Sequence, residues 1–82
     1  MRLDKYLKVS RLIKRRTVAN EACDAQRVKV NGKPARASYE VKPGDVLELT
    51  LGGHTLRVEV LEVAQTVRKE GASDLYRVLE QN

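Results

Sequence analysis

The feature that most constrains this chain of 82 residues is a single change of hydrophobic period after Gln26. Before that point apolar residues recur at helical spacing. After it, Val28 and Val30 alternate with basic residues, as in a strand with one buried face. Asn31-Gly32 then supplies the two-residue turn typical of a tight hairpin. The order predicts an α+β domain, with two N-terminal helices packed on a small, mostly antiparallel sheet.

Two short helices are predicted ahead of the change. Within residues 2–9, two leucines four residues apart form an apolar edge, and three cations share another face. The second helix is expected to start after Thr17, a residue type that caps helices well. Ala19, Ala22 and Cys23 lie on one face of it. Such small side chains would let the second helix approach the first helix or the sheet closely.

The rest of the chain is predicted to form strands joined by short turns. Pro34 confines the return strand of the first hairpin to an edge, because proline has no N–H to donate. Residues 42–45 read Lys-Pro-Gly-Asp, the pattern of a type II turn. Residues 69–73 break the alternation. The expected strands cover residues 28–30, 33–36, 46–51, 56–63 and 75–79, although a helical turn would also fit the last of these.

Neither a linker nor a repeat interrupts the chain, so residues 1–82 are expected to form one domain. No apolar run approaches the roughly 20 residues of a membrane-spanning helix, and the first residues do not resemble a secretory signal. The single cysteine cannot form an internal disulfide. These features predict a cytoplasmic protein that does not engage membranes.

Charge is divided unevenly along the chain. Residues 1–36 hold eleven Lys and Arg against three Asp and Glu, a net charge of +8, whereas residues 37–82 hold five against eight, a net charge of −3. A field of this shape orients a protein on a polyanion. Cations also gather before the second helix, where the helix dipole favours an anion such as phosphate. The candidate RNA-binding residues are Arg2, Lys5, Lys8, Arg11, Lys14, Arg15, Arg16, Lys29, Lys33 and Arg36.

No constellation of catalytic residues is visible. His54 is the only histidine and falls at a hairpin tip, where a solvated turn residue is expected. Cys23 stands among alanines and is expected to pack in the core. The three tyrosines are scattered and are expected to pack, so recognition should depend on phosphates and RNA shape more than on base stacking. The sequence therefore predicts a protein that is not an enzyme and needs no cofactor or metal.

Four short motifs occur in the order found in a known RNA-binding family. They are Arg2-Leu3-Asp4-Lys5-Tyr6-Leu7, Arg15-Arg16-Thr17-Val18-Ala19, Val28-Lys29-Val30-Asn31-Gly32-Lys33 and Lys42-Pro43-Gly44-Asp45. Together they resemble the S-four domain, named after small-subunit ribosomal protein four, with its alpha-L motif. The resemblance implies a motif core over about residues 1–50, C-terminal strands over 51–82, and a two-helix face plus first hairpin set against structured RNA. Gln26 departs from the pattern, since many members carry glycine there.

Among stand-alone members, residues 1–16 look very like the RqcP group of ribosome-associated quality-control proteins, and the resemblance extends over nearly the whole chain. It implies a monomer that binds obstructed large (50S) ribosomal subunits. There it would contact ribosomal RNA and stabilise P-site peptidyl-tRNA while an RqcH-type partner directs alanine tailing of the stalled chain.

Three alternatives remain at this point. A heat-shock type of large-subunit recycling factor tends to carry tryptophan and a long basic tail, and this chain contains no tryptophan. A detached RNA-targeting module of an RNA-modifying enzyme would co-purify with a catalytic partner. A DNA-binding regulator is a third option, although the Asn31-Gly32 hairpin directly after the helix pair fits the S-four pattern better.

Overall fold

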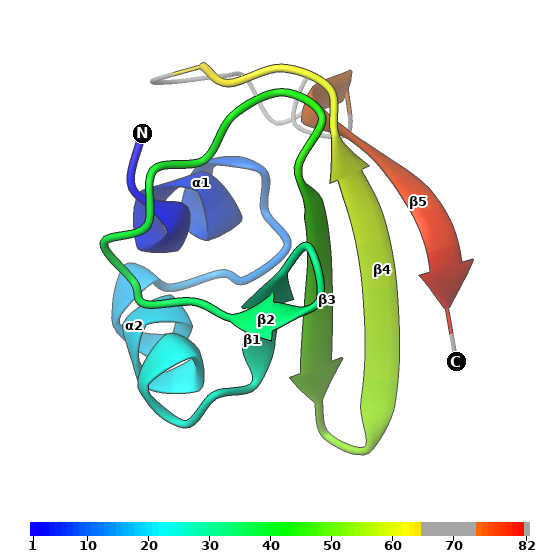
Figure 1. Ribbon diagram of the computed structural model, residues 1–82. Coiled ribbons are helices and arrows are strands. Elements are labelled where there is room, and N and C mark those ends of the chain that lie inside the picture. Colours follow the sequence, from blue (N-terminus) through cyan, green and yellow to red (C-terminus); the bar gives the residue numbers. More distant parts are fainter. Residues whose placement is uncertain (65–73, 82) are drawn as a thin grey trace.

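The computed structural model describes residues 1–64 and 74–81, and in that part of the chain two helices lie against one face of a five-stranded sheet (Figure 1). The sheet has the strand order β2-β1-β3-β4-β5, and every neighbouring pair is antiparallel. The predicted α+β fold is therefore confirmed. The elements are α1 (Leu3–Val9), α2 (Arg16–Asp24), β1 (Val28–Val30), β2 (Lys33–Pro34), β3 (Val46–Leu51), β4 (His54–Val60) and β5 (Tyr76–Gln81).

The start of α1 is fixed by the segment that follows β2. The N-cap residue Arg2 makes no side-chain cap hydrogen bond. Instead the backbone N–H of Leu3 donates to the carbonyl of Tyr39 at 2.8 Å, and that of Asp4 donates to the carbonyl of Ala37 at 3.1 Å. These bonds satisfy N–H groups that the first turn of a helix cannot pair internally. Helix α1 thus depends on a segment more than thirty residues further along the chain.

The prediction that Thr17 caps the second helix is wrong. Arg15 is the extended N-cap residue and makes no side-chain cap hydrogen bond, so α2 begins at Arg16 and Thr17 lies within its first turn. The start is displaced because the Arg16 side chain reaches back to Asp4 on α1. A tertiary contact therefore sets this helix boundary, overriding the local preference of the threonine hydroxyl.

Helix α2 ends in a left-handed turn at Gln26, whose φ is 60°. The N–H of Arg27 donates to the carbonyl of Ala22 at 2.9 Å, and the N–H of Gln26 donates to that of Cys23 at 2.9 Å. This pair of bonds is the Schellman pattern, in which the left-handed position is usually glycine. Gln26 thus occupies a left-handed position that suits glycine, the residue that the S-four resemblance leads one to expect there.

The turns follow their sequence signals. Asn31 and Gly32 have φ angles of 53° and 86°, so both central residues of the β1–β2 hairpin are left-handed, as predicted. Gly44 has a φ of 94°, and the N–H of Asp45 donates to the carbonyl of Lys42 at 3.1 Å, which confirms the type II turn.

Strand bounds differ from the prediction in β2, at both ends of β4, and in β5, which covers Tyr76–Gln81 in place of residues 75–79. Strand β2 is confined to two residues at the sheet edge, and β4 starts at His54, which is therefore a strand residue and not part of the turn. Strand β4 stops at Val60 because the N–H groups of Leu61 and Glu62 both turn to the carbonyl of Leu75. The last segment is a strand, as preferred, while the predicted break at residues 69–73 lies outside the described residues.

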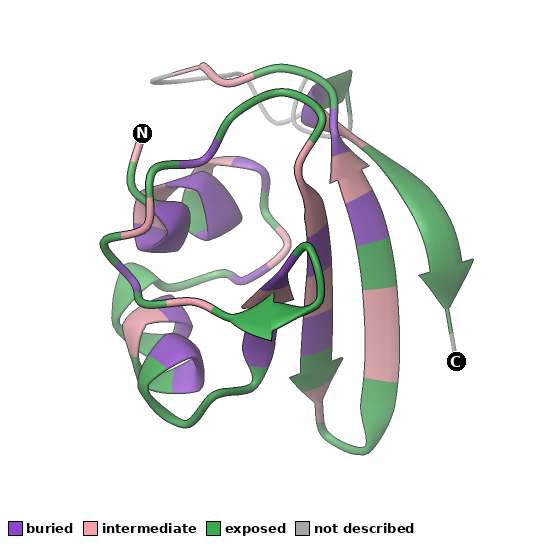
Figure 2. Cartoon of the chain, viewed as in Figure 1, coloured by how far each residue is buried: buried purple, intermediate pink, exposed green. Residues whose placement is uncertain are grey.

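The core lies between the helices and the inner face of the sheet (Figure 2). Tyr6 is completely buried, and its hydroxyl donates to the carbonyl of Leu75 at 2.6 Å. The small face of α2 is buried as predicted, which lets this helix pack closely. The largest fully buried apolar side chains are Leu3, Tyr6, Leu7, Val28, Leu47, Val58, Val60 and Leu75.

Candidate nucleic-acid interface

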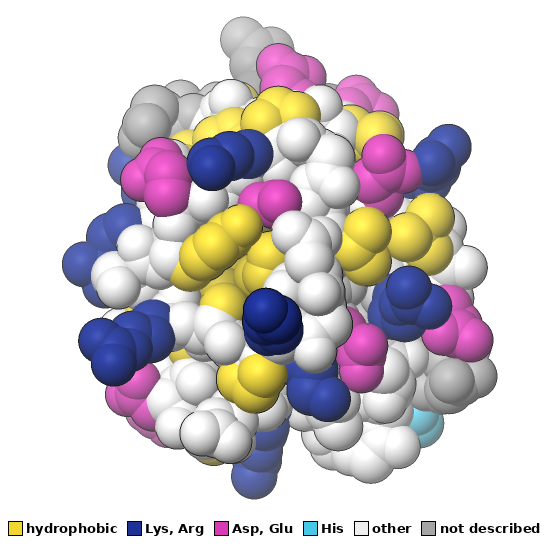
Figure 3. Space-filling view, viewed as in Figure 1, with side chains coloured by type: hydrophobic (Ala, Val, Ile, Leu, Met, Phe, Trp, Pro, Cys, Tyr) yellow, Lys and Arg dark blue, Asp and Glu magenta, His cyan; other side chains and the backbone are white. Residues whose placement is uncertain are grey.

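Most of the predicted RNA-binding side chains are accessible. Eight of the ten are exposed, and Lys5 and Lys29 are half-buried. Figure 3 shows Lys and Arg side chains along the helical side of the molecule with some Asp and Glu side chains among them, and a mixture of both kinds over the strands. Most of the segment of +8 charge therefore maps to the two helices, the link between them and the first hairpin.

The buried carboxylate of Asp4 binds two of the predicted RNA-binding arginines. Asp4 is 2% exposed, and its oxygens lie 3.2 Å from Nε of Arg2 and 3.3 Å from Nε of Arg16. It also accepts hydrogen bonds from Nδ2 of Asn20 at 3.4 Å and from the backbone N–H of Lys5 at 2.8 Å. The carboxylate thus joins the cations of α1 to those at the start of α2.

The environment of Asp4 keeps it ionised. Burial alone would raise the pKa of its carboxyl, but hydrogen bonds from Arg16, Arg2, Asn20 and the Lys5 backbone together outweigh burial and hold the pKa below its ordinary value. The side chains of Arg2 and Arg16 remain 51% and 46% exposed. Each guanidinium is therefore fixed on its inner side by Asp4 and can still present donors to an external anion.

Sequence reasoning did not assign Asp4 a role. The usable signal was an acidic residue in the first turn of a helix, on the same face as the leucines that build the core. A carboxylate buried at such a position requires cationic or hydrogen-bonding partners. The nearest cations in the fold are the ones predicted to bind RNA.

The link between the helices carries three further cations. Arg11 has a φ of 63°, a left-handed conformation that is uncommon for residues other than glycine. Ser10 and Ile13 are buried on either side of it, and the N–H of Ile13 donates to the carbonyl of Leu7 at 3.0 Å. The link is therefore anchored to the core while Arg11, Lys14 and Arg15 face solvent.

Lys29 does not belong to the helical surface. Val28 and Val30 are buried toward the helices, so Lys29 between them points to the outer face of the sheet. In the strand register Lys29 stands opposite Glu48, Glu48 opposite Arg57, and Arg57 opposite Glu80. This row alternates in sign, and Arg57 lies 3.4 Å from Glu80. The outer face of the sheet is therefore charge-compensated.

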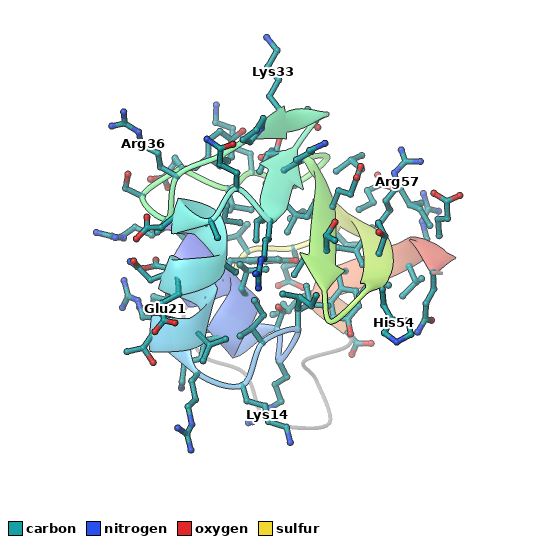
Figure 4. All side chains as sticks on the ribbon, turned by 90° about the horizontal axis from the view of Figure 1, so that it is seen from below. Lys14, Glu21, Lys33, Arg36, His54 and Arg57 are labelled. Carbon is teal, nitrogen blue, oxygen red and sulfur yellow. The ribbon has the colours of Figure 1, made fainter. Side chains whose placement is uncertain are left out.

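The remaining cations surround the end of the molecule that carries the two helices and the first hairpin. At this helical end they do not form one flat patch. Figure 4 shows Lys33 and Arg36 at one side of the molecule and Lys14 at the opposite side, with α2 between them. Arg57 lies away from these residues, beyond the sheet. Such an arrangement can meet phosphates approaching from more than one direction.

The residues predicted to be inert have structural roles. Burial, with smaller contributions from Asp4 and Asp24, raises the pKa of the Cys23 thiol to about 11, so this thiol is protonated at neutral pH. The Tyr39 hydroxyl donates to Asp45 at 3.1 Å, as the Tyr6 hydroxyl does to Leu75. Among residues 1–64 and 74–81, no group of three His, Cys, Asp or Glu side chains could hold a metal ion. Neither helix in this part of the chain is long and apolar enough to cross a membrane.

A family model described as the S4 domain matches residues 1–47, which include both helices, the first hairpin, and Asp4 with its partners Arg2 and Arg16. The chain belongs to the S4 domain family. Solved structures agree with this assignment. Vibrio cholerae Heat Shock Protein 15, determined as a trimer, superposes with a TM-score of 0.91 at 29% identity and covers 96% of this chain and 81% of its own. The solution structure of hypothetical protein HP1423 superposes with a TM-score of 0.82 at 30% identity over 100% of both chains.

Curated relatives narrow the position of the chain within the S4 family. The RQC P-site tRNA stabilizing factor of Bacillus subtilis is 51% identical over 99% of this chain and 94% of its own length. The factor of the same name from Halalkalibacterium halodurans is 56% identical over 95% of this chain and 89% of its own. Within the S4 family, this chain therefore belongs with the RQC P-site tRNA stabilizing factors, as its resemblance to the RqcP group implied.

Proposed function

We propose that this protein is a non-catalytic RNA-binding factor that holds tRNA in the P site of large ribosomal subunits obstructed by a nascent chain. The proposal rests on one observation: the buried carboxylate of Asp4 holds Arg2 and Arg16 side by side, with both side chains half exposed. The chain is also closely related to factors named for P-site tRNA stabilization. Residues 1–82 act as one RNA-binding domain, in the cytoplasm and as a monomer, and need no cofactor.

The distribution of charge suits a position between two RNAs. Phosphates repel one another, so a protein that stabilises the approach of tRNA to ribosomal RNA must supply cations on more than one side. Lys14 on one side of the helical end and Lys33 and Arg36 on the other meet this requirement. Because Asp4 fixes Arg2 and Arg16 before any RNA arrives, little side-chain entropy is lost when they bind phosphate.

The outer face of the sheet contributes little to this binding. Its charges alternate in sign and are paired across strands, so its net attraction for phosphate is small. In the proposed complex this face points away from RNA, toward solvent or toward an RqcH-type partner that delivers alanyl-tRNA.

The test is reconstitution on purified large subunits that carry peptidyl-tRNA. Lys14→Glu and Lys33→Glu each reverse a charge on one side of the helical end, and Arg57→Glu is the matched control on the outer face. We expect each helical-side variant to weaken binding and alanine addition, with tRNA retention affected more by one and ribosomal-RNA attachment more by the other. The control should bind within about twofold of the wild type, as expected for a screened surface charge.

Two outcomes would contradict the proposal. If Arg57→Glu impaired binding as strongly as the other two variants, attraction would be a property of net charge and not of the helical side. If the protein bound empty and tRNA-bearing subunits equally, a recycling role of the heat-shock type would fit better. The fold shared with Vibrio cholerae Heat Shock Protein 15 makes that the second candidate.

A further inference from the structure

A groove of about 600 Å³ runs between the C-terminal half of α2 and the segment that follows β2. Asn20, Asp24 and Gln26 line it on the helix side, and residues 34–38 line it on the other. Arg2 and Arg36 are exposed residues of the same groove. Its volume lies within the range of sites that hold one small organic ligand, roughly 300–1,000 Å³.

The helix-side wall offers hydrogen-bond acceptors. Asp24 carries a carboxylate, which only accepts when ionised. The Nδ2 group of Asn20 donates to Asp4, so the group of Asn20 that can serve a ligand as acceptor is its carbonyl oxygen. A groove that sets a carboxylate and an amide carbonyl beside two arginines does not suit a phosphate alone. It suits a ligand with an amino group inside the groove and a negative charge at the arginines.

Two residues of this wall are unfavourable for the fold itself. Asp24 is the last residue of α2, where the helix dipole disfavours a negative charge, and no basic residue occupies that last turn. Gln26 adopts a left-handed conformation that glycine would adopt with less strain. Residues that break local preferences side by side, in one groove, are characteristic of a functional site.

We propose that this groove takes one unstacked nucleotide whose base bears an exocyclic amino group. The amino group donates to Asp24 and to the carbonyl of Asn20, and the flanking phosphates meet Arg2 and Arg36. RNA-binding proteins read bases splayed from loops by such edge contacts, and a carboxylate that accepts from a base amino group discriminates against uracil. The inference rests on the proposed function, since the nucleotide belongs to ribosomal RNA or to tRNA.

The test compares two variants on α2 that change the charge equally. Asp24→Asn removes the groove carboxylate, whereas Glu21→Gln removes an exposed carboxylate that does not line this groove. Both variants gain one unit of positive charge, which by itself strengthens RNA binding. We expect Glu21→Gln to bind obstructed large subunits at least as well as wild type, and Asp24→Asn to bind about tenfold more weakly.

Chemical probing identifies the nucleotide and its source. Dimethyl sulfate and kethoxal report the pairing edges of adenine, cytosine and guanine, and a carbodiimide reports uracil. In subunits carrying peptidyl-tRNA, one adenine, cytosine or guanine should be protected by the wild type and by Glu21→Gln but reactive with Asp24→Asn. Mapping the protection on ribosomal RNA and tRNA separately tells which RNA supplies it.

Loss of protection cannot reflect unfolding, because Asp24→Asn removes an unfavourable charge from a helix end. The inference is overturned if Asp24→Asn binds as tightly as Glu21→Gln, if both give the same protections, or if the protected base is uracil. In those cases the proposed function still holds, provided that the wild type binds obstructed subunits. If the wild type fails to bind them at all, the proposed function fails and this inference with it.

Discussion

Replacing Asp4 with asparagine tests whether this buried carboxylate holds the two helices together. An ordinary hydrogen bond contributes roughly 1 kcal/mol, and one to a charged group roughly 1.5–3 kcal/mol. Because the side chains of Arg2 and Arg16 are about half exposed, their pairs contribute at the lower end, as surface pairs do. Asparagine keeps one acceptor oxygen for the Lys5 N–H. We therefore expect Asp4→Asn to lower the free energy of unfolding by about 2 kcal/mol at pH 7.

Thermal and urea unfolding followed by circular dichroism measure this loss. For a domain of this size, about 2 kcal/mol corresponds to a fall in Tm of roughly 10 °C. The matched control is Glu80→Gln, which breaks the exposed pair with Arg57 and should cost about 0.5 kcal/mol or less. If the two variants lost the same stability at pH 7, Asp4 would contribute no more than a surface charge, and the organising role assigned to it would be refuted.

The difference in stability between the wild type and Asp4→Asn should depend on pH. The folded-state pKa of Asp4 is lowered, so its contribution is complete above the unfolded-state pKa of about 3.9 and is lost as the pH falls through the folded-state value. The stability difference between wild type and Asp4→Asn should thus be constant from pH 7 to about pH 5 and shrink below about pH 4. A difference that grew in acid would contradict the sign of the shift.

Four further predictions use the same unfolding and binding assays. Tyr6→Phe should lower the free energy of unfolding by about 1 kcal/mol, because the carbonyl of Leu75 loses the hydroxyl donor but keeps the N–H groups of Leu61 and Glu62; an unchanged midpoint would show that this hydrogen bond adds no stability. Gln26→Gly should raise it by about 1 kcal/mol, since φ is 60° there; a loss of stability would contradict the strain assigned to that position. Gly32→Val should lower it by about 1–2 kcal/mol through backbone strain, because φ is 86° there and an added Cβ would meet nothing within 4 Å; Gly32→Asn should be milder. Arg16→Ala should fold but bind large subunits more weakly, with a salt slope reduced by about one phosphate, and normal binding near physiological salt would exclude Arg16 from the interface.

The parts of the fold that were predictable are those where residue type fixes the backbone locally. Asn-Gly and Pro-Gly specify their turns whatever surrounds them, and the alternation of Val28 and Val30 specifies the inner face of β1. The same alternation also placed Lys29 on the opposite face. Nearness in sequence to the helical cations is therefore no guide to the position of Lys29, because the alternation of side chains along β1 puts it on the other face.

The parts that were not predictable depend on packing between segments distant in sequence. Asp4, Arg16 and Asn20 meet only because α1 and α2 pack together, and nothing in their spacing indicates that they share a carboxylate. The start of α2 followed this contact and not the capping preference of Thr17. The groove beside α2 was invisible for the same reason, since its two walls come from segments that the first hairpin separates.

The hydrogen bond from Tyr6 to Leu75 joins residues that are 69 positions apart in the chain. During synthesis the helices leave the ribosome long before Leu75 does. Until β5 is added, the Tyr6 hydroxyl has no carbonyl partner and the apolar faces of α1 lack part of their cover. The packing beneath α1 is therefore complete only after most of the chain has been made.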